Sequence, residues 1–205
     1  FISTSSVCVT GLSTINITNE FNFFGKTVIM LLIQMGGLGF MTMATMVAMI
    51  LGEKITLKDR LVIREQMGST KLSGMVKLIR YVIFSTFLIE GLGAILLSFT
   101  FVPKFGIKGI FYSIFHSVSA FCNAGFDNFG STSLVAFQTD PLINLVLAAL
   151  IITGGLGFMV WFDLATQLSK KKRRLRFHTK LVLFLTAGIL FTGTVSTLLI
   201  EWNNP

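Results

Sequence analysis

The sequence predicts an all-α membrane protein that repeats one unit, which consists of a membrane span, a pore loop and a second span. Three observations predict this fold class: the composition, the length of the apolar blocks and an internal repeat. Of the 205 residues, 53% are hydrophobic and 13% are charged, whereas about 25% of the residues in a soluble domain are charged. The apolar residues gather in blocks of about twenty, which is the length that crosses ~30 Å of hydrocarbon.

The basic residues indicate which loops are cytoplasmic. The net charge is +8, and fourteen of the 17 Lys and Arg residues lie in two stretches between apolar blocks, Lys54–Arg80 and Lys170–Lys180. By the positive-inside rule, the loops 52–80 and 169–180 are cytoplasmic and the protein is a multi-pass membrane protein. Nucleic-acid binding is not expected, because the run KKKRRLRFHTK stands directly between two hydrophobic segments.

Four segments are long enough to span the bilayer. They are Thr27–Leu51, Tyr81–Phe101, Leu142–Phe162 and Leu181–Ile200. The third begins with a helix start signal, because Asp140 can cap the helix and Pro141 suits its first position. The segment KITLKDRLVIREQMG after the first span is amphipathic and is predicted to lie on the cytoplasmic surface.

A fifth apolar stretch, Gly109–Phe126, is predicted to enter and leave the membrane on the outer side. If both basic loops are cytoplasmic, an even number of crossings separates them, and the spans at 81–101 and 142–162 already supply two. The expected shape is a half-helix over Ile110–Phe121 and an extended return through Cys122 to Gly125. Since re-entrant backbone is tolerated only inside protein or beside a water-filled cavity, this topology predicts a pore or a cavity.

An internal repeat links the two halves of the chain. FISTSSVCVTGL at 1–12 aligns with FHSVSAFCNAGF at 115–126, and GGLGFM occurs at both 36–41 and 154–159. Several parallel units of this kind around one axis can enclose a central pore. The predicted segments are the end of repeat one (1–51), a cytoplasmic amphipathic linker (52–75), a complete repeat two (76–168), a cytoplasmic basic loop (169–180) and the first span of repeat three (181–205).

The two return loops carry neither a carboxylate nor a basic side chain. Backbone carbonyl oxygens therefore remain as the groups that can replace the water around a cation. Gly11 and Gly125 would give the backbone the freedom to turn a carbonyl inward, although glycines also terminate ordinary turns. The predicted ion-binding residues are Cys8, Val9, Thr10, Gly11, Cys122, Asn123, Ala124 and Gly125.

The strings TSSVCVTGLS, LLIQMGGLGFMT and IFHSVSAFCNAGFDNFG resemble the Trk/Ktr/HKT superfamily of potassium transporters, and specifically its Ktr-type membrane subunit. The resemblance implies four repeats of this unit in one chain, arranged around a central pore as in a potassium channel, and this sequence would be an internal fragment of that chain. It implies filter strands centred on Gly11 and Gly125, with a glycine at position 11 favouring potassium over sodium. Cys8 departs from the threonine of many relatives. The resemblance further implies a homodimer and a cytosolic ring of nucleotide-binding regulatory subunits facing the loops 52–75 and 169–180.

Some interpretations stay open at this stage. The chain could be a non-transporting membrane scaffold, or a sodium-permeable cation transporter of the same family. Glu90, near the middle of a span, is either coupled to ion passage or hydrogen-bonded between helices. The glycines of GGLGFM serve either close helix packing or flexibility. No enzyme is expected, because a phosphate-binding glycine loop, a GxSxG motif and paired carboxylates are missing from the sequence. No cofactor is expected beyond potassium as substrate.

Overall fold

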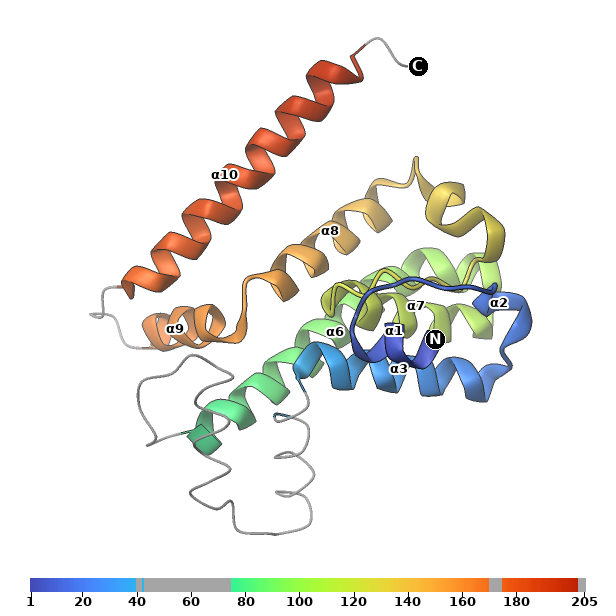
Figure 1. The fold of residues 1–205 in the computed structure, drawn as a ribbon, viewed down its shortest axis with the longest axis horizontal. Helices are drawn as coiled ribbons and strands as arrows, with labels where there is room; N and C mark the ends of the chain where they lie inside the picture. Colours follow the sequence, from blue (N-terminus) through green and yellow to red (C-terminus); the bar gives the residue numbers. More distant parts are fainter. Residues whose placement is uncertain (40–41, 43–74, 170–174, 203–205) are drawn as a thin grey trace. The chain divides into compact units, whose positions relative to one another are not determined.

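The computed structural model describes residues 1–39, 42, 75–169 and 175–202 (Figure 1). None of these residues lies in a β-strand, which confirms the all-α fold class. The amphipathic segment at 54–68 and most of the second half of the span predicted over 27–51 lie outside the described residues. The helices in chain order are α1 (Ile2–Val7), α2 (Ile17–Glu20), α3 (Phe23–Leu38), α6 (Met75–Phe105), α7 (Ile107–Phe121), the 3₁₀ helix η1 (Gly130–Phe137), α8 (Pro141–Gly155), α9 (Phe158–Ser169) and α10 (Phe177–Ile200).

Two of the predicted spans are single helices in the structure. Residues 79–105 of α6 and the whole of α10 are each long and apolar enough to cross a membrane. The span predicted over 142–162 is divided into two helices in the structure, because α8 ends at Gly155 and α9 begins only at Phe158. Gly157 lies in this break with a φ of +83°, a conformation that residues with a Cβ rarely adopt. Neither α8 nor α9 alone is long enough to cross a membrane, but the two helices together are long and apolar enough.

The start of α8 agrees with its sequence signal. The carboxylate of Asp140 accepts hydrogen bonds from the backbone N–H groups of Leu142 and Ile143, at 3.1 and 3.4 Å. Pro141 is the first residue of the helix, where its missing N–H leaves no partner unsatisfied. The predicted N-cap is therefore confirmed.

The chain divides into two compact units, residues 1–155 and residues 156–205. In the first unit α7 is central, because it packs against α6, α8 and α3, while α1 packs against α3 (Figure 1). Two apolar clusters lie against α7. The first joins it to α1, α2 and α3 through Ile2, Ile17, Ile29, Ile33, Phe115, Val118, Ala124 and Phe126. The second joins it to α6, η1 and α8 through Leu97, Phe101, Ala120, Phe121, Phe137, Ile143, Val146 and Leu150.

In the second unit a carboxylate on α9 holds the start of α10. One oxygen of Asp163 accepts hydrogen bonds from the backbone N–H of Arg176 at 2.9 Å and from the hydroxyl of Thr179 at 2.8 Å. The other oxygen lies 3.7 Å from the Nε of Arg176. Since the N-cap residue of α10 makes no capping bond with its own side chain, Asp163 supplies an acceptor for the helix start from another element.

Candidate functional site

Both predicted filter segments follow a helix that ends in the same turn. Cys8 and Cys122 are the C-cap residues of α1 and α7 and keep helical backbone angles. Val9 and Asn123 then take the left-handed conformation, with φ of +54° and +60°. The prediction of an extended return from Cys122 onward is therefore wrong for its first two residues, because a left-handed residue closes the helix before the chain turns back.

The hydrogen bonds of this turn repeat with the sequence. The N–H of Thr10 donates to the carbonyl of Ser5 at 2.9 Å, and the N–H of Ala124 donates to the carbonyl of Ser119 at 2.8 Å. In both loops this bond closes the last turn of the helix in the manner of a Schellman motif. A left-handed β-branched residue such as Val9 costs about 1–3 kcal/mol. The conformation is retained because the helix end on one side and the packed loop on the other determine it.

The structure brings the two predicted glycines together. Gly11 and Gly125 have φ of +74° and +75°, and both line one cavity of about 170 Å³. A Cβ added to Gly11 would overlap the carbonyl oxygen of Ala124, whereas a Cβ on Gly125 would meet nothing within 4 Å. The first return loop is thus packed directly against the backbone of the second.

The first glycine of each GGLGFM motif lies against the last residue of a helix, Gly36 against α1 and Gly154 against α7. A Cβ on Gly36 would overlap the carbonyl oxygen of Val7, and a Cβ on Gly154 would overlap that of Phe121. Val7 and Phe121 are equivalent positions of the repeat and are the last residues of the two helices. Close packing thus explains these glycines. The later glycine of each motif follows the end of a helix with a left-handed φ, +81° at Gly39 and +83° at Gly157.

A buried polar group lies behind the second loop. Glu90 on α6 is 4% exposed, and the thiol of Cys122 donates to its carboxylate at a long 3.9 Å. The hydroxyl of Ser117 donates to the backbone carbonyl of Glu90 at 2.6 Å. The buried amide of Gln34 on α3 lies near this carboxylate but outside hydrogen-bond geometry. Glu90 therefore links α6 to α7 next to a predicted filter residue, which agrees with the interhelical interpretation.

Asp127 also lines the cavity that Gly11 and Gly125 share. Its two carboxylate oxygens accept hydrogen bonds from the N–H of Phe129 at 2.9 Å and from the hydroxyl of Ser133 at 2.7 Å. Neighbouring loop residues therefore hold this carboxylate at the edge of the cavity.

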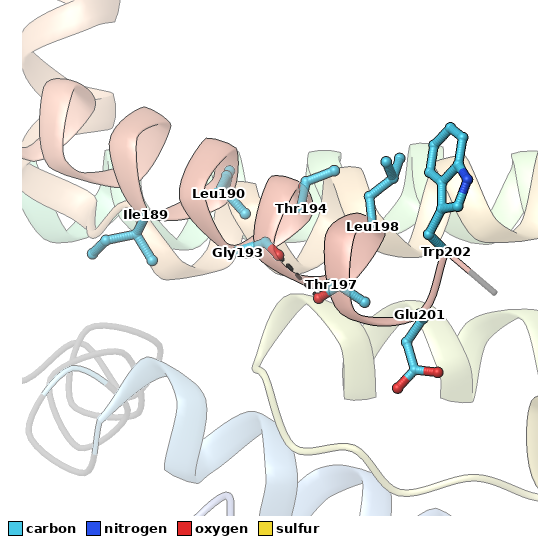
Figure 2. A pocket seen from close by; sticks show the side chains of 8 residues that line it. All are labelled: Ile189, Leu190, Gly193, Thr194, Thr197, Leu198, Glu201 and Trp202. Carbon is cyan, nitrogen blue, oxygen red and sulfur yellow. Dashed lines mark hydrogen bonds between the residues drawn. The ribbon is translucent and has the colours of Figure 1, made fainter. Parts of the chain in front are cut away.

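A broad hollow on α10 carries no candidate site. Figure 2 shows the side chains that line it, with the hydroxyl of Thr197 donating to the carbonyl of Gly193 at 2.9 Å. All of the lining residues belong to α10 and the turn that follows it. Since a ligand site needs groups that converge from several directions, this hollow is one face of a helix.

Two sets of contacts were missed by the sequence reasoning. The serines Ser5 and Ser119 were aligned as repeat partners, but their role as backbone acceptors that close the turn depends on the loop geometry. Asp163 carries no motif, and its acceptor role at the start of α10 depends on the packing of two helices. The only signal for Asp163 was an acidic residue in an apolar segment.

Helices that are long and apolar enough to cross a membrane, together with repeated glycine-bearing loops that meet at one cavity, are typical of membrane transport proteins. Residues 1–203 match the family model TrkH, described as a cation transport protein. The chain belongs to this family of membrane cation transporters.

Named relatives agree with this assignment. The chain is 45% identical to the potassium/sodium uptake protein NtpJ of Enterococcus hirae over 204 residues, which are 99% of this chain and 45% of the relative. It is 39% identical to the Ktr system potassium uptake protein B of Bacillus subtilis over 206 residues, 100% of this chain and 46% of the relative. The protein of the same name from Vibrio alginolyticus is 37% identical over 206 residues, 100% of this chain and 45% of the relative. The chain thus spans less than half the length of these relatives.

Proposed function

We propose that this chain carries the first two filter strands of a potassium uptake protein and that potassium, as substrate, binds there to backbone carbonyl oxygens alone. The observation that supports the proposal most directly is the contact between the two return loops, where Gly11 packs against the carbonyl of Ala124. Loops with the same turn, from equivalent positions of a repeat, line one cavity. The residues that would lend oxygens are Cys8, Val9, Thr10, Gly11, Cys122, Asn123, Ala124 and Gly125.

The chemistry of the loops suits a partly dehydrated monovalent cation. Their side chains carry no charge, so the ion would be stabilised by carbonyl dipoles in place of its hydration shell. The fifteen-residue helix α7 ends at the second loop, and the negative end of its dipole favours a cation there. An inside-negative membrane potential would then drive uptake by about 2.3 kcal/mol per charge for each 100 mV.

The larger arrangement is part of the same proposal. Four such repeats in one chain would surround a central pore in the plasma membrane, with the loops 52–80 and 169–180 on the cytoplasmic side. The family resemblance supports a homodimer with a cytosolic ring of nucleotide-binding regulatory subunits. The names of the relatives from Bacillus subtilis and Vibrio alginolyticus support potassium as the transported ion.

A sodium-permeable transporter is the second candidate function. The name of the Enterococcus hirae relative, a potassium/sodium uptake protein, favours it. The presence of glycine at position 11 favours potassium, because relatives that prefer sodium often carry serine there.

The test is rubidium uptake, with sodium as competitor, by the full-length protein in cells that lack potassium uptake. Wild type is compared with Gly11→Ser and Gly125→Ser at matched membrane expression, and Gly188→Ser serves as control. Gly188 lies inside α10 with nothing near its Cβ position, so this variant should transport as wild type does. Both loop variants should lose the preference for rubidium over sodium.

Each other outcome has a definite meaning. Unchanged selectivity in both loop variants would reject the filter assignment. Sodium uptake by wild type equal to its rubidium uptake would favour the second candidate function. A well-folded wild type without any uptake would favour the membrane scaffold.

A further inference from the structure

Three basic residues lie outside the two basic loops, namely Lys26, Lys104 and Lys108. The positive-inside rule places them on the outer side of the membrane, where basic residues are depleted. The ammonium group of Lys104 lies over the ring of Phe137, 4.5 Å from its centre. Lys26 and Lys108, which are far apart in the sequence, line one pocket. Two positive charges that meet in a region with few basic residues favour the binding of an anion between them.

The pocket lies between the first turns of α3 and α7 and has a volume of about 350 Å³. The rings of Phe23 and Phe111 meet there with their centres 4.7 Å apart. No acidic residue lines the pocket among those that the structure describes. The lining residues are Phe23, Lys26, Ile107, Lys108, Phe111 and Tyr112.

The charges in this pocket are of one sign. The ammonium group of Lys26 donates to the carbonyl of Thr18 at 3.0 Å, which uses one of its three N–H donors. Lys108 is exposed and close enough for the two positive charges to repel. Lys108 is also in the first turn of α7, whose N-cap residue makes no side-chain capping bond. An anion would relieve this repulsion and accept hydrogen bonds from the lysines.

The rim of the pocket is apolar and exposed. Phe23 is 68% exposed and Ile107 is 88% exposed. A soluble anion would leave this surface uncovered, whereas a lipid would cover it with its acyl chains. We propose that the pocket holds the headgroup of an anionic phospholipid of the outer leaflet, with its phosphate between Lys26 and Lys108 and its acyl chains against Phe23 and Ile107. This proposal does not depend on the filter assignment.

The test is the retention of phosphatidylglycerol by the full-length protein. Wild type and variants are reconstituted in vesicles of phosphatidylcholine and phosphatidylglycerol at 3:1 and extracted in mild detergent. The phosphatidylglycerol that remains on each protein is counted by native mass spectrometry. Lys108→Gln should retain at least about tenfold less lipid, which is the factor expected when one hydrogen bond from a charged donor is lost. Lys26→Gln should behave in the same way.

Lys104→Gln is the matched control, because it removes the same charge from a lysine that does not line the pocket. It should retain as much phosphatidylglycerol as wild type, and Lys108→Arg should do so as well. An equal loss of phosphatidylglycerol in Lys104→Gln and Lys108→Gln would overturn the proposal, because it would show that the lipid is attracted by the overall positive charge and not held in the pocket. Equal retention in all variants would overturn it too. Only monodisperse preparations are compared, and Lys26→Gln keeps the test decisive if Lys108→Gln fails to fold.

Discussion

Replacing Gly11 by alanine should destabilise the protein more than the same change at Gly125. Both residues have a left-handed φ, at +74° and +75°, so alanine costs about 1–2 kcal/mol at either position. Only at Gly11 does the added Cβ overlap a backbone atom, the carbonyl oxygen of Ala124. Because that oxygen belongs to a packed loop, displacing it adds about 1–3 kcal/mol. We therefore expect about 1–2 kcal/mol for Gly125→Ala and about 2–5 kcal/mol for Gly11→Ala.

The assay measures the free energy of unfolding of the full-length protein in detergent by denaturant titration. It is carried out without potassium or sodium, because a bound ion stabilises the folded state by mass action and would mask the difference. Gly188→Ala is the control, since it adds a Cβ in open space within a helix and should stabilise slightly. Equal losses at Gly11 and Gly125 would refute the reasoning, because the contact between the loops would then contribute nothing. A smaller loss at Gly11 would refute it as well.

Two further predictions concern neighbouring contacts. Gly154→Ala should abolish uptake or prevent folding, because its Cβ would overlap the carbonyl oxygen at the end of α7. Gly155→Ala should be tolerated, because its Cβ would lie 3.8 Å from the nearest side chain. Equal uptake by the two variants would contradict the close packing of Gly154. Asp163→Ala should lower the free energy of unfolding by about 1–3 kcal/mol, because the start of α10 loses its acceptor and an ion pair; an unchanged thermal midpoint would contradict this.

Most helices could be predicted from the sequence, because helix formation depends on residues that are close together in the chain. Apolar blocks of the right length predicted the spans now seen as α6 and α10, and α7 ends at Phe121 as expected. The start of α8 was also predictable, because a cap acts within three residues of its own position. The extended path expected after Cys122 was wrong because a capping residue in the left-handed conformation leaves only a weak signal when it is Asn or Val.

The role of the glycines at the break between α8 and α9 stayed open for a related reason. GGLGFM indicated both close packing and flexibility, and sequence spacing cannot decide which glycine serves which purpose. The structure separates them: Gly154 lies against the end of α7, and Gly157 adopts a positive φ at the break. The same limit applied to Asp127, whose partners depend on how the following loop folds back.

The sequence by itself determined the class of protein, the repeat and the positions of the loops, because hydropathy, loop charge and self-similarity are properties of the chain itself. Only the tertiary structure decided that Gly11 lies against the carbonyl of Ala124, that Glu90 lies beside Cys122 and that Lys26 and Lys108 share a pocket. These contacts join residues on different helices, and their distances depend on the packing of several elements at once. Periodicity and composition contain no information about such distances, whereas the packed backbone fixes them.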